Sequence, residues 1–340
     1  MRRPDGTWDV YDDYVLDFAI DRMRAGERIA LVTLAAIEGS SPRPQGAQMA
    51  ISETGRWVGY LSGGCIERAI VAEALQTIEA GESRRVRYGR GSKYMDIQLP
   101  CGSAIELVFD VSKSEEQLAA IDEQRQQRLV GTMTVPTCSG DGAHIVRSYE
   151  PRRRLVVLGV GPGAISLAKL GKSVGCDVTL YTPDQPTIAA IAPTGIETAT
   201  IAGGDSIPGF RADARTAIVF MFHDHRWEQR LLPAILRTDA FYIGAMGSRR
   251  AHRARIEALQ VQGVAADQLA RIRGPAGLFS GVKNAPDIAL SILAEIVQVE
   301  MQQSQACKSG EHKGFSPIVA GSLTDAAGAQ RQNSVFPRYA

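Results

Sequence analysis

The C-terminal half of the chain contains the segment Leu155-Val156-Val157-Leu158-Gly159-Val160-Gly161-Pro162-Gly163-Ala164. Four apolar residues are typical of a buried strand, and the spacing GxGxxA follows directly before a helical run. Gly159 allows a tight turn, Gly161 lets a phosphate approach the backbone, and Ala164 lets the helix pack closely on the strand. Pro162 fits the first helical turn, where its missing N–H matters least. The segment therefore predicts a strand, a phosphate-binding turn and a helix of the dinucleotide-binding type.

The residues around this segment extend the same pattern. From residue 155 to about residue 300, short apolar runs alternate with amphipathic helices, which is typical of a parallel, doubly wound sheet. In an NAD-binding sheet, an acid at the end of the second strand usually binds the ribose hydroxyls. Here Thr182 takes that place, and Asp184 follows two residues later. This departure argues against ordinary NAD binding and leaves a phosphate or pterin nucleotide open as the ligand.

Two further predicted strands, at 217–222 and 241–246, end in polar residues. Ligands of such sheets lie beyond the carboxyl ends of the strands, which places His223 and Asp224 at a binding edge. Ser248 and Arg249, at a predicted helix start, suit a phosphate. The alternatives are loop groups that satisfy the backbone and a capped helix with a solvated basic face. The candidate cofactor contacts of this half are Gly159, Gly161, Gly163, Ala164, His223, Asp224, Ser248 and Arg249.

The N-terminal half has its most informative pattern in Leu61-Ser62-Gly63-Gly64-Cys65-Ile66-Glu67. Two glycines turn the backbone sharply, and the following residues read as a helix, so we expect Cys65 at or near a helix N-terminus. Unpaired N–H groups and the helix dipole there favour a thiolate over a thiol. Such a thiol suits a nucleophile, a sulfur carrier or a ligand for a soft metal. The alternative is a small buried residue that packs between elements.

Two other segments accompany this turn. Gly39-Ser40-Ser41-Pro42-Arg43-Pro44-Gln45-Gly46 follows a strand-like run, and the side chains of Ser40, Ser41 and Arg43 suit an oxyanion such as phosphate. Prolines that only stiffen a turn are the alternative. Cys101 stands beside a glycine, between short apolar elements. Neither Cys65 nor Cys101 belongs to a CxxC pair, which argues against a structural zinc site.

These motifs together resemble the XdhC/CoxI family, the maturation factors of xanthine and carbon monoxide dehydrogenases. The resemblance rests on residues 39–47, residues 59–67 and Cys101-Gly102, and it continues into the C-terminal half. It implies a chaperone, rather than an enzyme, that holds molybdenum cofactor and inserts it in sulfurated form into a molybdenum hydroxylase. It also implies that Cys65 and Cys101 contact the molybdenum or its sulfido ligand, beside Gly63 and Gly64.

The resemblance leaves the form of the cofactor open between molybdopterin and its cytosine dinucleotide, and NAD(P) is less favoured. The implied partners are the molybdenum hydroxylase apoenzyme, a cysteine desulfurase and cofactor biosynthesis proteins, and a homodimer is left open. Two alternative functions remain: an NAD(P)-dependent oxidoreductase, and a docking scaffold that has no ligand of its own.

The composition narrows the class of protein further. A net charge of +1 gives no reason to expect nucleic acid or an anionic membrane as a partner. The sequence has neither a long apolar run nor the apolar core of a signal peptide. Its 5 cysteines are scattered, which argues against a disulfide framework and indicates the cytoplasm.

The length of 340 residues predicts two α/β domains. We place an XdhC/CoxI-like domain at 1–112, a connector with a hairpin at 113–152, and a Rossmann-like domain at 153–301. The polar remainder, 302–340, is predicted to be disordered, because its composition buries little apolar surface.

Overall fold

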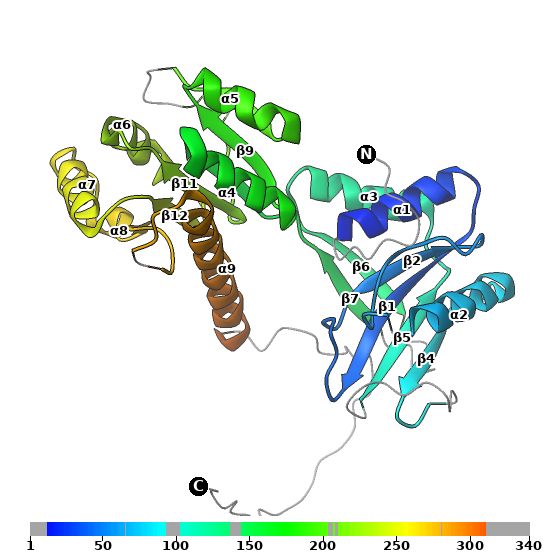
Figure 1. Ribbon diagram of the computed structural model, residues 1–340. Coiled ribbons are helices and arrows are strands. Elements are labelled where there is room, and N and C mark those ends of the chain that lie inside the picture. Colours follow the sequence, from blue (N-terminus) through cyan, green and yellow to red (C-terminus); the bar gives the residue numbers. More distant parts are fainter. Residues whose placement is uncertain are drawn as a thin grey trace, which may run out of the picture. The chain divides into compact units, whose positions relative to one another are not determined.

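The computed structural model describes residues 12–64, 66–92, 103–136, 144–202, 207, 210–279 and 281–310. The chain divides into two compact units, which Figure 1 shows with their elements labelled. Among the described residues, the first unit comprises those up to Ala120 together with Thr132–Arg147, and the second comprises Ile121–Gly131 and those from Ser148 to Gly310. Within the described part of the chain, none of the helices combines the length and apolar character that a membrane crossing needs.

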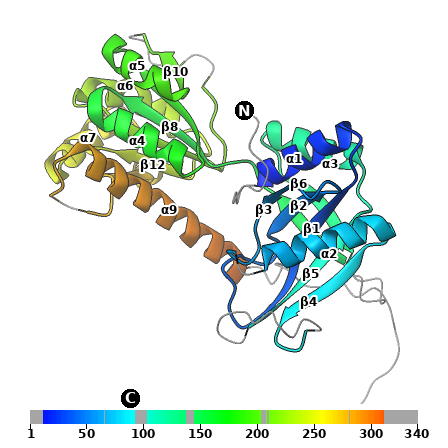
Figure 2. The ribbon, with the colours of Figure 1, turned by 45° about the vertical axis from the view of Figure 1, so that its right-hand side comes forward.

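The first unit is built on a five-stranded antiparallel sheet of order β3-β2-β1-β5-β4. Its strands are β1 (Ile29–Glu38), β2 (Gln48–Ser52), β3 (Trp57–Gly59), β4 (Arg84–Gly89) and β5 (Ala104–Asp110), and its first two helices are α1 (Asp12–Arg24) and α2 (Glu67–Ala80). Helix α2 lies along the sheet (Figures 1 and 2) and packs Ile70, Ala74 and Ile78 on the apolar side chains of β1. It ends at Gly81, whose φ of +70° makes the left-handed cap that favours glycine.

The elements that follow β5 in the chain are α3 (Glu115–Gln126), β6 (Gly131–Pro136) and β7 (His144–Tyr149). Strands β6 and β7 pair with each other, at the place where the sequence indicated a hairpin. Residues 137–143, between the two strands, lie outside the described residues.

The second unit is a six-stranded parallel sheet of order β10-β9-β8-β11-β12-β13, which confirms the doubly wound fold predicted from the sequence. The strands are β8 (Arg154–Gly159), β9 (Asp177–Thr182), β10 (Glu197–Thr200), β11 (Thr216–Met221), β12 (Tyr242–Ala245) and β13 (Ile272–Arg273). The helices are α4 (Gly161–Ser173), α5 (Gln185–Ile191), α6 (His225–Ile235), α7 (Arg249–Val261), α8 (Ala266–Leu269) and α9 (Ala285–Gly310), with a 3-10 turn at Ala192–Thr194.

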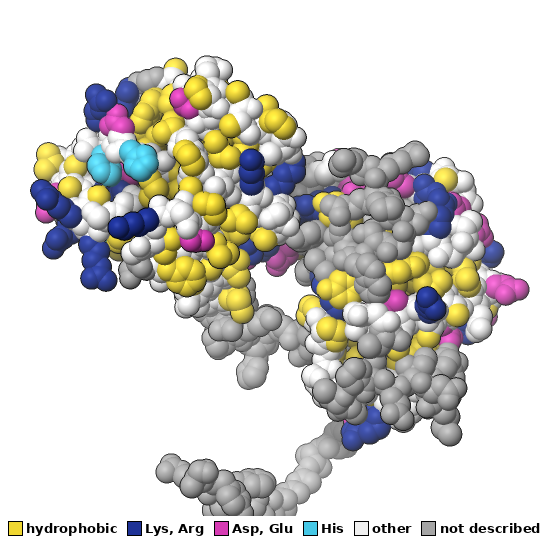
Figure 3. Space-filling view, in the orientation of Figure 1, with side chains coloured by type: hydrophobic (Ala, Val, Ile, Leu, Met, Phe, Trp, Pro, Cys, Tyr) yellow, Lys and Arg dark blue, Asp and Glu magenta, His cyan; other side chains and the backbone are white. Residues whose placement is uncertain are grey.

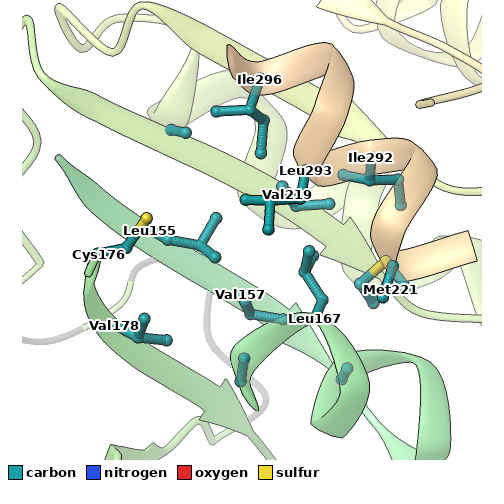
Figure 4. Packing of buried hydrophobic residues seen from close by; sticks show 14 of the residues in the cluster. Leu155, Val157, Leu167, Cys176, Val178, Val219, Met221, Ile292, Leu293 and Ile296 are labelled. Atoms are coloured by element: carbon teal, nitrogen blue, oxygen red, sulfur yellow. The ribbon is translucent and has the colours of Figure 1, made fainter. Parts of the chain in front are cut away.

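Both faces of this sheet are covered, because the side chains of each central strand alternate between two cores. Leu155 and Val157 of β8 pack with α4 and α9, whereas Val156 and Leu158 pack with α6 and α7. Figure 2 shows α4 and α9 in front of the sheet, and Figure 4 shows Ile292 of α9 beside Met221 of β11. The chain therefore leaves β8 toward one face and β11 toward the other, which makes the carboxyl ends of these two strands the topological switch point.

The last helix extends beyond the predicted end of the second domain. The sequence analysis ended the Rossmann-like domain at residue 301 and predicted disorder from residue 302, whereas α9 continues to Gly310. Ile292, Ile296 and Val299 pack in the core and hold the helix in place. Extending an existing helix costs little free energy, because the unfavourable nucleation step is already made and Gln and Ala have high helix propensity. Residues 311–340 of the predicted tail lie outside the described residues.

Candidate functional site

The turn that precedes Cys65 is built around the carboxylate of Glu67, the first residue of α2. Its oxygens accept hydrogen bonds from the N–H groups of Leu61 (3.2 Å), Ser62 (2.7 Å), Gly63 (3.1 Å) and Gly64 (2.8 Å), and from the Ser62 hydroxyl (2.6 Å). Gly63 and Gly64 have φ values of +78° and +114°, which L side chains rarely adopt. The two candidate glycines are therefore required by the shape of the turn itself.

Glu67 is buried, with 3% of its surface exposed. Burial raises the pKa of its carboxyl, but the hydrogen bonds from Ser62 and the turn backbone outweigh this and lower the pKa below its ordinary value. The sequence argument for a thiolate at Cys65 relied on unpaired N–H groups at this helix start. In the structure, the N–H groups of residues 61–64 donate to Glu67, and that of Ile66 donates to the Ser62 hydroxyl at 3.1 Å. These five N–H groups are therefore hydrogen-bonded within the chain, and they do not supply the unpaired donors on which that argument relied.

The predicted oxyanion loop lies beside this turn. The N–H of Ser40 donates to the Ser103 hydroxyl at 3.3 Å, and the two hydroxyl oxygens are 3.5 Å apart. The ring of Pro42 lies 4.0 Å from the point where a Cβ on Gly63 would stand. The first unit thus brings together three segments: residues 39–46, called here the Ser40 loop; residues 61–64, called here the glycine turn; and Ser103, which follows Cys101-Gly102 in the sequence. Cys65 and Cys101 themselves lie outside the described residues.

Within the loop, Ser40 is exposed, and Ser41 and Arg43 are half-buried. The Ser41 hydroxyl accepts the N–H of Arg43 at 3.3 Å, which makes a local turn. The Arg43 guanidinium lies over the ring of Tyr60, 5.0 Å from its centroid. The loop is thereby attached to the residue that leads into the glycine turn, and Ser40 keeps its side chain at the surface.

In the second unit, the glycines after β8 are explained by packing as well as by ligand approach. A Cβ on Gly159 would lie 2.6 Å from Cβ of Met221, and a Cβ on Gly163 would lie 3.0 Å from its terminal methyl. Ala164 is fully buried, as the close contact of helix and strand requires. Gly161 has a φ of +74° and open space where a Cβ would stand, so only its backbone conformation demands glycine.

The N–H of Gly161 is already occupied. It donates to the hydroxyl of Thr187, on α5, at 2.8 Å. Asp184 caps α5: its carboxylate accepts the Thr187 N–H at 2.8 Å and also bonds the Thr187 hydroxyl. Thr182 is buried, and its hydroxyl accepts the Asp184 N–H at 3.2 Å. The backbone group that would face a pyrophosphate, and the acid nearest to the ribose position, are both engaged within the chain, which argues against ordinary NAD binding.

The polar candidates after β11 and β12 stand at two helix starts. Asp224 caps α6 by accepting the N–H of Arg226 at 3.0 Å, and hydrogen bonds from that arginine lower the pKa of Asp224 to about 2. Ser248 caps α7 by accepting the N–H of Ala251 at 3.1 Å. His223 and Arg249 are exposed. The capping roles of Asp224 and Ser248 match the alternative interpretation, in which these polar groups satisfy the backbone at helix starts. The exposed side chains of His223 and Arg249 stay available for contact with a phosphate.

A buried ion pair behind these helix starts was missed by the sequence analysis. The guanidinium of Arg255, on α7, donates to Glu228, on α6, from Nε at 2.8 Å and from Nη2 at 2.9 Å. Nη2 also donates to the carbonyl of Met246 at 2.9 Å, and Nδ1 of His225 lies 2.9 Å from Glu228 Oε2. Both charged side chains are almost fully buried. The pair therefore fixes the start of α6 against the turn that leads into α7.

A sequence signal for this pair did exist. Glu228 precedes Leu231, Leu232 and Ile235 at the spacing of a core-facing helical stripe, where a charge is unusual.

A histidine lies next to the buried pair. His252 lies 3.3 Å from Arg255 Nη1, and burial together with that positive charge lowers the pKa of His252. Figure 3 shows histidine side chains at the surface of the second unit, with Lys and Arg side chains around them.

In the described ranges, no group of three or more His, Cys, Asp or Glu side chains could hold a metal ion.

Family models match two separate parts of the chain, one in each unit of the structure. Residues 22–89 match the XdhC and CoxI family, and residues 155–296 match the XdhC Rossmann domain. The chain belongs to the XdhC and CoxI family.

Particular relatives span most of the chain. The molybdenum cofactor insertion chaperone PaoD of Escherichia coli K12 is 32% identical over 309 residues, which cover 86% of this chain and 91% of the relative. A probable xanthine dehydrogenase subunit of Bacillus subtilis 168 is 23% identical over 315 residues, 80% of this chain and 93% of the relative. A crystal structure described as a xanthine dehydrogenase from Bacillus halodurans shares the fold, with a TM-score of 0.71 at 21% identity over 86% of this chain and 97% of that one.

Proposed function

We propose that this protein is a molybdenum cofactor chaperone, which binds the cofactor and inserts it into a molybdenum hydroxylase of the xanthine dehydrogenase type. The likeness to PaoD supports the proposal because it extends over both units. The observation that carries it is the convergence, in the first unit, of the Ser40 loop, the glycine turn beside Cys65 and the residue after Cys101-Gly102.

The proposal assigns separate roles to the two ends of the cofactor. Thiolates of Cys65 and Cys101 are suitable soft ligands for molybdenum or contacts for its sulfido group. The phosphate end would be held by Ser40, Ser41 and Arg43, or by groups of the second unit. The second-unit candidates are the backbone at Gly159, Gly161, Gly163 and Ala164, and the side chains of His223, Asp224, Ser248 and Arg249.

The partners follow from the same role. An insertion factor meets the apoenzyme that receives the cofactor, a cysteine desulfurase that supplies the sulfido sulfur, and the proteins that make the cofactor. A cytoplasmic location completes the proposal, which leaves a homodimer open. Both molybdopterin and its cytosine dinucleotide form are compatible with the donor groups named above.

Anaerobic copurification tests the proposal directly. The parent protein, Cys65→Ala and Cys176→Ala are purified in parallel, and molybdenum and oxidised pterin are measured in each. Cys176 is a matched control, because it is a buried free thiol in the core of the second unit. We expect the parent and Cys176→Ala to retain cofactor and Cys65→Ala to lose most of it. Equal retention by all three proteins, or none in the parent, would contradict the proposal.

A further inference from the structure

We propose that Glu67 is a positioning residue: its carboxylate is a built-in anion that shapes the turn of residues 61–64 and so fixes the backbone on both sides of Cys65. The part of this inference that concerns cofactor rests on the proposed function. The geometry of the turn, and the part of the test that probes it, are independent of any ligand.

Glu67 does not act as an ordinary helix cap. In a capping box, a glutamate three residues into the helix reaches back to a single N–H group. Glu67 is the first residue of α2 and accepts N–H groups from four consecutive residues, 61–64. Consecutive N–H groups that point into one hollow form a nest, a backbone shape that binds anions such as phosphate. Here the chain supplies the anion itself.

The two neighbours of Cys65 are both tied to this carboxylate. The N–H of Gly64 donates to Glu67 Oε2 at 2.8 Å. The N–H of Ile66 donates to the Ser62 hydroxyl at 3.1 Å, and that hydroxyl donates to the same Oε2 atom at 2.6 Å. The two described neighbours of Cys65 in the sequence are therefore linked to one oxygen atom, Gly64 directly and Ile66 through the Ser62 hydroxyl.

A carboxylate in this position excludes a second anion from the turn. The N–H groups that could hold a phosphate are occupied, and a phosphate beside Glu67 would meet a like charge. The phosphate end of the cofactor must then contact other donors. The turn keeps one task, which is to hold the backbone of Gly64, the residue before Cys65, in a fixed place.

The same helix offers a matched control. Glu73 is as buried as Glu67, at 3% exposed, but it pairs with Arg84, whose Nε lies 3.1 Å from Glu73 Oε1. Replacing Glu73 by Gln removes a buried charge from α2 without touching a donor of the turn. An effect that Glu67→Gln has and Glu73→Gln lacks is therefore specific to the turn.

The test begins with the parent protein, so it does not depend on a variant that folds. Amide hydrogen exchange is measured at residues 61–64 and, for comparison, at the exposed Thr54 in the turn between β2 and β3. We expect exchange at 61–64 to be at least about tenfold slower, because each of these N–H groups is bonded to a buried oxygen. Equal exchange rates at the two places would overturn the proposal.

The variants then separate positioning from general stability. Iodoacetamide labelling of Cys65 is followed at one fixed pH in Glu67→Gln, Glu67→Asp and Glu73→Gln, by the mass of the tryptic peptide 57–68. We expect both Glu67 variants to speed amide exchange at 61–64 and to change the labelling rate severalfold. Glu73→Gln should leave both unchanged. Unchanged rates in the Glu67 variants, or equal changes in Glu73→Gln, would show that Glu67 is only a buried helix residue.

Cofactor retention is the last measurement, and it distinguishes the two proposals. We expect Glu67→Gln to lose cofactor, with Glu67→Asp retaining more because it keeps the charge. If Cys65→Ala retains cofactor fully, the proposed function fails, while amide exchange and labelling still judge Glu67. If Cys65→Ala loses cofactor and Glu67→Gln retains it fully, the positioning role is wrong and the chaperone function stands.

Discussion

Replacing Arg255 by Met should destabilise the second unit strongly. The change leaves the carboxylate of Glu228 buried, with His225 as its remaining side-chain partner, and it also removes a donor from the Met246 carbonyl. Breaking a buried ion pair by removing one partner costs about 3–5 kcal/mol, because the remaining charge stays desolvated. Removing both charges together, as in Arg255→Met with Glu228→Leu, should cost less than the single change, since apolar groups of similar volume are tolerated there.

The assay must report on the second unit alone, because a chain of two units need not unfold in one step. Trp227, at the start of α6, stacks on Phe222 with ring centroids 5.4 Å apart. With the other tryptophans, Trp8 and Trp57, replaced by Phe, urea unfolding followed by fluorescence reads this unit. Arg253→Met is the control.

Arg253 is exposed on the same helix as Arg255, and such surface changes usually stay within about 0.5 kcal/mol. If Arg255→Met and Arg253→Met unfold at the same urea concentration, the buried pair does not stabilise the unit as argued. A double variant less stable than Arg255→Met would refute the claim that the cost lies in the orphaned charge.

Three further predictions concern ligand, pH and redox activity. Arg249→Ala should weaken binding of the phosphate end of the cofactor by about 1.5–3 kcal/mol, roughly tenfold to a hundredfold, with the neighbouring exposed Arg250→Ala as the control; equal affinities by titration would make Arg249 a solvated residue. Burial raises the pKa of Asp213, but hydrogen bonds, chiefly from Arg128, lower it to about 2 from 3.8; its stabilising contribution is therefore full above pH 3.8 and lost as the pH falls through 2. Acid unfolding followed by circular dichroism should show Asp213→Asn less stable than the parent near neutral pH and approaching it below pH 2. The parent should not transfer hydride from NAD(P)H to simple aldehydes or acids, and steady turnover that Gly161→Val abolishes would favour the oxidoreductase instead.

The features that the sequence predicted well are those written in consecutive residues. Strand β8, the GxGxxA turn and α4 follow from an apolar run, glycine spacing and a proline that fits the first helical turn. The parallel sheet follows from the alternation of such units, and the family from motifs that stand in short segments. Helix α2 was predicted to follow the turn that contains Gly63 and Gly64, and it begins at Glu67, because the periodicity of a helix is local.

The features that the sequence did not reveal depend on contacts between distant segments. The hydrogen bond from the Gly161 N–H to Thr187 forms only when α5 packs against the turn between β8 and α4. The pairing of Glu228 with Arg255 joins two helices, so the partner of Glu228 depends on how these helices pack. The position of Glu228 on an apolar stripe did indicate that this charge needs a partner in the core. Cys65 and Cys101 stay predictions, since their roles depend on residues beyond those described.

The turn at residues 61–64 has a consequence for how the proposed chaperone would release its cofactor. A loop that orders only when a ligand arrives spends part of the binding energy on its own ordering, and it must disorder again at release. A turn closed by an internal carboxylate is already ordered without a ligand. In the proposed chaperone, neither binding nor release of the cofactor would require this turn to fold or unfold.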